Sequence, residues 1–285
     1  MPRVQASVFS HESPLGRWEL ASRPPVAALR PYVRHLHGFV EATPAPLRRR
    51  EVPIGAVVMI VSLEHGWQLE DVGGATLRRV SFVAGLQDGP VLVEHGGASH
   101  GMEVYFTPLG ARAFFGVSLD ALTGQVLELE DVLGPAATTL IERLRATRGW
   151  EDRFDLLEEA IVRRMAAGRE PARDLCWAWG RLAASHGRAE IGGLADELGW
   201  SHRRLVAQFR EHVGMPPKRV ARILRFHRAR SLLDDAASPS LAAVAYECGY
   251  ADQPHFTREF RALAGVTPRE FLAHRIPGGG GVSVG

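Results

Sequence analysis

A repeat in the last third of the chain decides the fold. The stretch LADELGW at residues 194–200 returns 50 residues later as VAYECGY at residues 244–250. Further on, LVAQFREHVGMPPKRV at residues 205–220 returns after a shift of 51 as FTREFRALAGVTPREF at residues 256–271. The one inserted residue falls in a turn, where insertions are tolerated. Self-similarity at a fixed spacing predicts two copies of one supersecondary unit.

Each copy has the pattern of a helix, a tight turn and a second helix. Gly199 and Gly249 stand where the first helix of each copy should end, because glycine tolerates the left-handed conformation found there. Ser201 and Asp252 follow as N-cap residues for the second helix. This is the layout of a helix-turn-helix, whose second helix enters the major groove of DNA.

The helical spacing divides the residues of the second helices into two faces. Leu205, Phe209 and Val213 recur every four residues and should face the core. The outward residues, which we expect to form the DNA interface, are His202, Arg203, Val206, Ala207 and Arg210 in the first unit and Gln253, Thr257, Arg258 and Arg261 in the second.

The outward residues suit different kinds of DNA contact. Arg203 and Arg258 have the fork geometry that matches a guanine edge, and Gln253 matches adenine. Val206 and Ala207 suit thymine methyl groups. The remaining four fit phosphate as well as base. A single exposed arginine is usually just solvated, but recurrence on one face of two matched helices favours the interface.

A long helix is predicted between the two units, over residues 218–233. Sixteen residues of helix span roughly 24 Å. That length would let two units address adjacent turns of DNA, which lie about 34 Å apart. Its arginines, Arg222, Arg225, Arg228 and Arg230, fit either a phosphate-facing surface or a solvated helix face.

Composition excludes several classes of protein. The 285 residues are 46% hydrophobic and 23% charged, which is typical of a globular protein and not of a disordered one. No apolar run has the length that a membrane span needs. Two cysteines, Cys176 and Cys248, exclude a disulfide scaffold and a four-thiolate zinc site. We therefore expect a soluble, cytoplasmic chain without a membrane partner.

Charge and periodicity divide the chain into two domains. Residues 1–167 carry 17 basic and 20 acidic side chains, whereas residues 168–285 carry 17 basic and 12 acidic ones, which suits a nucleic-acid partner for the rear half. Short apolar runs with glycine breaks predict strands over the first 130 or so residues, and residues 134–148 and 150–167 have helical spacing.

We therefore predict an α+β chain of three parts. Residues 1–168 form a mainly-β, barrel-like domain that ends in helices, with the boundary at residues 168–171. Residues 169–276 form an all-α domain of two helix-turn-helix units joined by a long helix. Residues 277–285, which begin with a proline and four glycines, form a flexible tail.

The stretch from Ile191 to Arg275 resembles the DNA-binding domain of AraC/XylS-type bacterial transcription regulators. The resemblance rests on the two repeated blocks quoted above, the linking helix, and the segment GVTPREF at residues 265–271. It implies two helix-turn-helix units that bind double-stranded promoter DNA. It also implies an N-terminal domain that senses a small-molecule effector and forms a homodimer, with RNA polymerase as a further partner. The chain departs from the family at Val206 and Ala207, which are apolar, and at Pro254, which has no side-chain donor.

The front domain is less informative. His95, His100 and Glu103 are only loosely spaced like a metal site, and we interpret the histidines as surface or turn residues. Six aromatic residues fit either a pocket or a plain core: Trp67, Phe82, Tyr105, Phe106, Phe114 and Phe115. Leu157, Ile161 and Met165 fit equally a helix that joins two chains and one that packs on its own domain.

The sequence thus predicts a sequence-specific transcription regulator of the AraC/XylS type, without catalytic activity, cofactor or metal, and controlled by an effector in the front domain. An alternative is a ligand-independent regulator whose front domain only dimerises. A DNA-repair methyltransferase with a thiolate zinc domain is excluded by the cysteine count. A metabolic enzyme in the front domain has no nucleophile–base, phosphate-loop or paired-carboxylate motif to support it.

Overall fold

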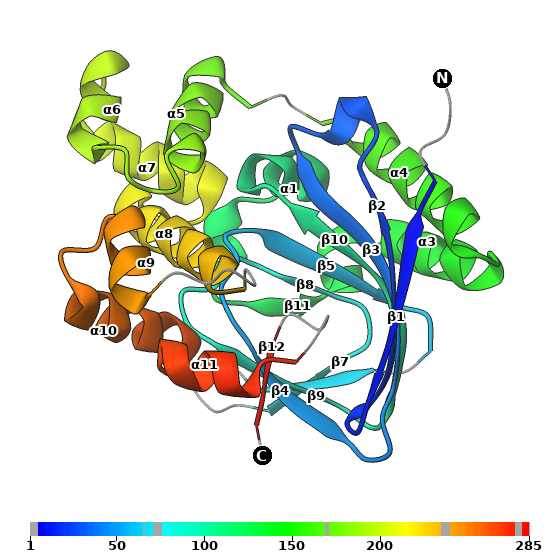
Figure 1. Ribbon diagram of the computed structural model, residues 1–285. Coiled ribbons are helices and arrows are strands. Elements are labelled where there is room, and N and C mark those ends of the chain that lie inside the picture. The colour runs from blue at the N-terminus through cyan, green and yellow to red at the C-terminus, as the bar shows by residue number, and fades with distance from the viewer. Residues whose placement is uncertain are drawn as a thin grey trace.

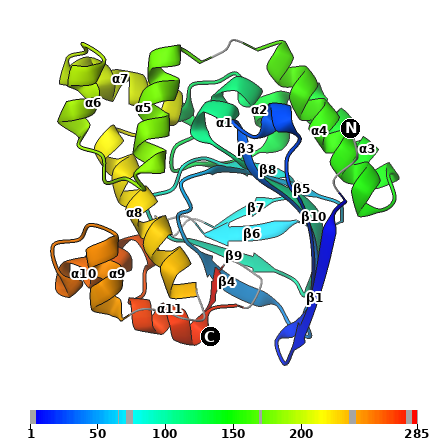
Figure 2. The same ribbon diagram turned by 45° about the horizontal axis from the view of Figure 1, so that its top comes forward.

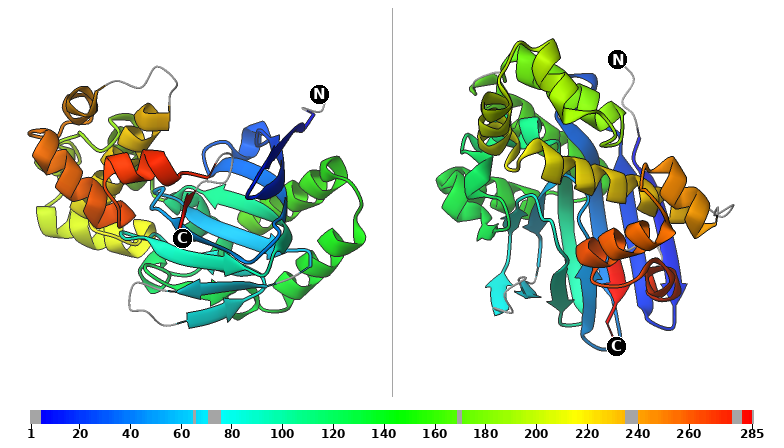
Figure 3. Two further views of the ribbon diagram at one scale, coloured as in Figure 1. Left: turned by 60° about the horizontal axis from the view of Figure 1, so that its bottom comes forward. Right: turned by 90° about the vertical axis from the view of Figure 1, so that its left-hand side faces the viewer.

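The computed structural model describes residues 5–64, 66–70, 76–168, 171–234, 240–276 and 281–284. A β-rich domain and a helical domain lie side by side (Figure 3). The predicted order, with a mainly-β domain before an all-α one, is confirmed. No helix in the described ranges combines the length and the apolar character that crossing a membrane requires.

The β-rich domain contains two sheets. The larger sheet has the spatial order β1 (Ser7–Ser13), β2 (Gly16–Arg23), β3 (Val33–Ala42), β10 (Ala98–Phe106), β5 (Val57–Ser62), β8 (Phe82–Ala84) and β11 (Val126–Glu128). The smaller has the order β12 (Gly281–Ser283), β4 (Leu47–Glu51), β9 (Val91–His95), β6 (Trp67–Glu70) and β7 (Thr76–Arg79). All pairings are antiparallel. Within the described residues no ladder joins the two sheets, so the expected barrel is not closed.

Side-chain alternation gives the larger sheet two different faces. Met102, Val104 and Phe106 of β10 are fully buried and belong to the main core, whereas Glu103 and Tyr105 point to the other face and line a cavity. The main core also contains Phe154, Leu157 and Ile161 of α4. The predicted amphipathic helix therefore packs on its own domain.

Helices flank the larger sheet (Figure 1). They are η1 (Ala27–Leu29), α1 (Pro108–Phe115), η2 (Leu119–Ala121), α2 (Leu129–Leu133), α3 (Pro135–Ala146) and α4 (Trp150–Ala166). The start of α4 touches β3 closely, because a Cβ added at Gly38 would lie 2.3 Å from the Trp150 ring. A buried Arg23, paired with Asp155 at 2.7 Å and Glu158 at 2.5 Å, fixes the same helix to β2.

The helical domain contains the two predicted units at the two ends of one helix (Figure 2). Its helices are α5 (Arg173–Ala184), α6 (Ile191–Glu197), α7 (His202–Val213), α8 (Pro217–Asp234), α9 (Leu241–Glu247), α10 (Gln253–Ala264) and α11 (Pro268–His274). Of the predicted boundary, Arg169 and Glu170 lie outside the described residues, so its position stays a prediction.

Two contacts join the first unit to the β-rich domain. The Thr123 hydroxyl donates to the carbonyl of Gly214 at 2.8 Å, just after α7, and the Ser118 hydroxyl donates to the carbonyl of Glu211 at 3.2 Å. An ion pair between Arg219 and Asp88 follows at the start of α8. The C-terminal end of the first recognition helix is therefore anchored to the front domain.

The prediction of a flexible tail is wrong for residues 281–284, while residues 277–280 lie outside the described part. Gly281, Val282 and Ser283 pair with Glu51, Arg50 and Arg49 as strand β12, beside β4 (Figure 1). Val282 is only 2% exposed. The glycine run hid this strand, because a β-branched residue beyond it can still extend the free edge of a sheet.

Candidate nucleic-acid interface and ligand cavity

The second helix of each unit has well-defined ends. The Ser201 side chain accepts a hydrogen bond from the Arg204 N–H at 3.2 Å, and Asp252 accepts one from the His255 N–H at 2.6 Å. These are the N-caps that the sequence predicts. At the other end, Gly214 and Gly265 adopt left-handed conformations, with φ of 96° and 72°. The repeat therefore produces two recognition helices, α7 and α10, of twelve residues each.

The inward faces of α7 and α10 are buried as predicted. Leu205, Phe209 and Val213 are 0% exposed, and so are Phe256 and Phe260. Burying each such side chain stabilises the fold by about 1.5–3 kcal/mol. Because the core side is fixed by these residues, the opposite face of each helix is fixed as well.

The nine residues expected at the DNA interface all retain exposed surface. Val206 and Thr257 are half-buried, and the exposed ones are His202, Arg203, Ala207, Arg210, Gln253, Arg258 and Arg261. Among the described residues, none of the four arginines forms an ion pair. When these arginines contact DNA, no ion pair within the described structure has to break first. Their contact with DNA stays a prediction.

The turns of the two units are built alike. The N–H of Trp200 donates to Ala195 O at 2.9 Å, and the N–H of Tyr250 donates to Ala245 O at the same distance. Ala195 and Ala245 are both buried, with exposed fractions of 3% and 1%. On the outer side, the Arg204 guanidinium lies 4.5 Å from the Trp200 ring. The repeat is thus visible in contacts as well as in sequence.

The arginines of α8 serve the protein itself. Arg222 contacts Glu259 of α10 through two hydrogen bonds, at 2.7 and 3.2 Å. Arg228 pairs with Glu247 of α9 at 2.5 Å, and Arg225 donates to a backbone carbonyl. These three residues therefore join the linking helix to its neighbours, a role that helical periodicity alone did not suggest.

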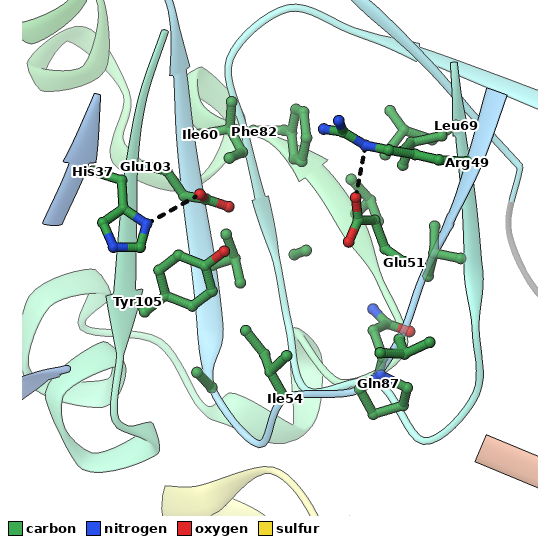
Figure 4. A pocket seen from close by; sticks show the side chains of 18 of the residues that line it. His37, Arg49, Glu51, Ile54, Ile60, Leu69, Phe82, Gln87, Glu103 and Tyr105 are labelled. Atoms are coloured by element: carbon green, nitrogen blue, oxygen red, sulfur yellow. Dashed lines mark ion pairs between the residues drawn. The ribbon is translucent and has the colours of Figure 1, made fainter. Parts of the chain in front are cut away.

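A cavity of about 400 Å³ lies between the two sheets (Figure 4). Its apolar wall contains Phe39, Ile60, Trp67, Leu69, Phe82 and Val93. Of the six aromatic residues singled out in the sequence, Trp67, Phe82 and Tyr105 line this cavity. Phe106, Phe114 and Phe115 instead stack on one another within the core. A cavity of this size and lining is typical of a small-molecule site.

Arg49 and Glu51 of β4, His95 of β9 and Glu41 of β3 form a polar network where the smaller sheet meets the end of β3. Arg49 contacts Glu41 at 2.7 Å and Glu51 at 2.8 Å, and His95 lies 3.0 Å from Glu41. Burial alone would raise the pKa of Glu41, but Arg49 and the hydrogen bond from His95 outweigh it and lower that pKa. Burial raises the pKa of Glu51, Arg49 opposes this shift, and repulsion from the carboxylates of Glu103 and Glu41 adds to it.

The opposite wall carries a second polar group. Glu103 lies 3.8 Å from the imidazole of His37 (Figure 4). Burial raises the pKa of Tyr105 well above its usual range, and the charge of Glu103 beside it adds to this shift. Both walls therefore present carboxylates to the cavity.

The linking helix of the DNA-binding domain supplies part of the cavity wall. His227 and Arg230 of α8 line it, next to Arg34 of β3. Burial and the charges of Arg230 and Arg34 lower the pKa of His227 to about 4. Burial also lowers the pKa of Arg34, whose guanidinium donates to the carbonyl of Ile54 at 3.1 Å. In the described ranges no carboxylate forms an ion pair with Arg34 or Arg230.

The residues weighed as a metal site do not converge. Of the two interpretations of His95, as a surface or a turn residue, the first is wrong, because His95 is 2% exposed and pairs with Glu41, while its Nδ1 accepts the Gly97 N–H just after β9. His100 contacts Glu64 at 3.2 Å, and Glu103 faces the cavity. No group of three potential ligands for a metal ion occurs among the described residues.

Comparisons with known proteins match two separate regions of the chain. A family profile described as a helix-turn-helix domain matches residues 194–274. The HTH-type transcriptional activator RhaS of Escherichia fergusonii is 39% identical over 82 residues, which cover 29% of this chain and 29% of that relative. The chain belongs to the AraC/XylS family of transcriptional regulators. Within this AraC/XylS regulator the matched region runs from the middle of α6 to the end of α11.

Other matches extend over the rest of this AraC/XylS chain. A profile described as a domain of unknown function, DUF6597, matches residues 21–128. An AraC-type regulator structure from Chromobacterium violaceum is 30% identical, covers 37% of this chain and 95% of its own, and has a TM-score of 0.34. ToxT of Vibrio cholerae O395, bound to (E)-4-(8-methylnaphthalen-1-yl)but-3-enoic acid, is 12% identical over 82% of this chain and 96% of its own, with a TM-score of 0.48.

Proposed function

We propose that the chain is a sequence-specific DNA-binding transcription regulator, with no catalytic role, whose activity depends on a small molecule in the cavity. The observation that carries the first part is the pair of matched recognition helices, capped alike, at the two ends of α8. Each presents exposed arginines that no acidic partner neutralises in the described structure.

The DNA side of the proposal assigns two roles to the exposed residues. Arg203, Gln253 and Arg258 read base edges, because their side chains make two hydrogen bonds in one plane. Val206 and Ala207 contact thymine methyl groups. His202, Arg210, Thr257 and Arg261 hold the phosphates and set the register. Phosphate contacts make binding fall steeply as salt rises.

The proposal of effector control is supported by the residues that α8 contributes to the cavity wall. His227 and Arg230 belong to α8, which also positions both recognition helices. A ligand that contacts these side chains changes the free energy of one arrangement of the domains relative to another, which is what coupling requires. This contact favours effector control over the alternative of a ligand-independent regulator.

Further features are proposed from the family. We propose promoter DNA as the macromolecular partner, a homodimer as the active assembly and RNA polymerase as the protein contacted at the promoter. Because the curated relatives named RhaS are transcriptional activators, activation is the proposed direction of control. The cytoplasm is the proposed location.

Recovery of bound fragments from sheared genomic DNA tests the proposal. The expected result is one enriched sequence motif with two half-sites, bound more tightly than a scrambled duplex in a fluorescence-anisotropy titration. Typical specific sites exceed non-specific DNA by about 10³-fold or more. Equal affinity for motif and scrambled duplex at every salt concentration would refute sequence-specific binding.

A further inference from the structure

The cavity changes its chemistry along its length. Ile60 and Phe82 lie at one end in Figure 4, Ile54 lies at the other, and the acidic side chains of Glu51 and Glu103 lie between them. The Ile54 end adjoins α8, since a Cβ on the next residue, Gly55, would lie 3.4 Å from Ile223 and Leu224. The Phe82 end in Figure 4 is apolar apart from the Arg49 guanidinium, which lies over the Trp67 ring at 5.3 Å, and the Ile54 end carries Arg34, which donates to the Ile54 carbonyl.

Among the described residues, three carboxylates of the cavity wall, those of Glu41, Glu51 and Glu103, have one arginine, Arg49, in ion-pair contact. Glu41 and Glu51 share the single guanidinium of Arg49. On the other wall, the ion-pair partner of Glu103 is His37, at 3.8 Å. The side chains of Glu51 and Glu103 are 36% and 20% exposed, and a cation placed between two such partly buried carboxylates relieves their repulsion. This part of the cavity suits an ammonium group.

The basic end has the opposite imbalance. The Nε of Arg230 is buried without a hydrogen-bond partner among the described residues, and Arg34 has only a carbonyl as acceptor. An arginine fork binds a carboxylate through two parallel hydrogen bonds. This part of the cavity therefore suits a carboxylate that contacts α8 directly.

The apolar end supplies a third, independent indication of a ligand. Trp67 lines the cavity and is 4% exposed, yet its indole Nε1 is buried with no acceptor in the described structure. Buried donors are rarely left unpaired unless a ligand, water or ion completes them. The face of an aromatic side chain at this end is a weak acceptor for that N–H and fills the space beside Trp67 and Phe82.

We propose that the cavity binds an α-amino acid with a large apolar side chain. Its ammonium lies between Glu51 and Glu103, its carboxylate contacts Arg230 and Arg34, and its side chain fills the end lined by Phe82 and Trp67. The three groups branch from one Cα, so the ammonium and the carboxylate can reach neighbouring acidic and basic side chains, and the charges of Glu51 and Arg230 do act on one another. The proposal builds on the effector site proposed above and names its ligand class.

Three probes that share one ring separate the charges. L-phenylalanine carries both charges, 2-phenylethylamine only the ammonium, and 3-phenylpropanoate only the carboxylate. In calorimetric titrations of the full chain without DNA, L-phenylalanine should bind at least ten-fold more tightly than either single-charge probe. Binding of 3-phenylpropanoate as tight as that of L-phenylalanine, or no binding of all three probes, overturns the proposal.

Substitutions then assign each charge to its contact. Glu103→Gln should weaken the two ammonium probes about ten-fold without weakening 3-phenylpropanoate. Arg230→Gln should weaken the two probes that carry a carboxylate, L-phenylalanine and 3-phenylpropanoate, about ten-fold without weakening 2-phenylethylamine. Arg228→Gln is the matched control on the same helix, because Arg228 pairs with Glu247 and does not line the cavity. Uniform losses for all three probes in both test variants, with unchanged melting temperatures, would contradict the assignment.

The two proposals fail separately. Probe binding without any DNA motif would refute the regulator and leave the amino-acid site standing. A clear DNA motif, with no response of the chain to any of the three probes, would refute the amino-acid site alone.

Discussion

Replacing Arg258 by alanine tests whether α10 reads bases. Arg258 is exposed and forms no ion pair among the described residues, so its loss leaves no buried partner unsatisfied. The free energy of unfolding should then stay within about 0.5 kcal/mol of the parent value. A lost bidentate contact with a guanine costs about 1–3 kcal/mol of discrimination at one base position. That range corresponds to roughly 5- to 150-fold in relative affinity.

The assay compares the recovered motif with its single-base variants by fluorescence anisotropy, for the parent chain and for Arg258→Ala. The variant should lose its preference at one position and keep it at the others. Arg222→Ala is the matched control, because Arg222 contacts Glu259, the residue next to Arg258 in α10, at 2.7 and 3.2 Å. It should cost about 1 kcal/mol of stability without changing base preference. An equal loss on every duplex, with a smaller salt slope, would make Arg258 a phosphate contact and refute base reading.

Three other perturbations test the scaffold. Asp252→Ala removes the N-cap of α10 and should lower the free energy of unfolding by about 1 kcal/mol in urea denaturation, with Ser201→Ala doing the same for α7; no change in either would mean that the caps are dispensable. Deleting residues 277–285 removes the buried Val282 and should cost about 1.5–3 kcal/mol by thermal or chemical denaturation, whereas an unchanged midpoint would show that β12 does not hold the domains together. The pKa of His227 is about 4 in the folded chain, below its ordinary value, so the unfolded chain binds a proton there more readily. The stability that neutral His227 provides is therefore complete above about pH 6.5 and is lost as the pH falls to about 4, on the order of 3 kcal/mol in all. His227→Gln should remove that part of the pH dependence of the free energy of unfolding.

The helical domain could be predicted closely because its signals are local. Spacing of apolar residues, capping side chains and glycines at helix ends each act within a few residues, and the repeat supplied every signal twice. Leu205 and Phe209 are buried where the helical spacing placed them. The position of α8 relative to the front domain is not a local property, and therefore the role of Arg230 could not be found in this way.

The front domain shows what local signals leave out. The sequence predicts strands, but whether they close into a barrel or form two sheets depends on pairings between residues far apart in the chain, such as Arg49 with Val93. The charged cluster of Glu41, Arg49 and Glu51 has no local signature at all, because one of its members comes from a different strand. The same holds for β12, which pairs with a strand about 230 residues earlier in the sequence.

The physical connection between cavity and DNA interface has two routes. On one, Arg230 and His227 belong to the helix that also carries both recognition helices at its ends. On the other, Arg49 and Glu51 face the cavity from β4, whose outer edge holds β12 and, through it, the end of the second unit. A ligand that contacts both Glu51 and Arg230 therefore acts on the two attachments of the second unit at once, while the first unit stays anchored through Thr123 and Gly214. If the effector proposal holds, we expect such a ligand to change the spacing of the two recognition helices on DNA.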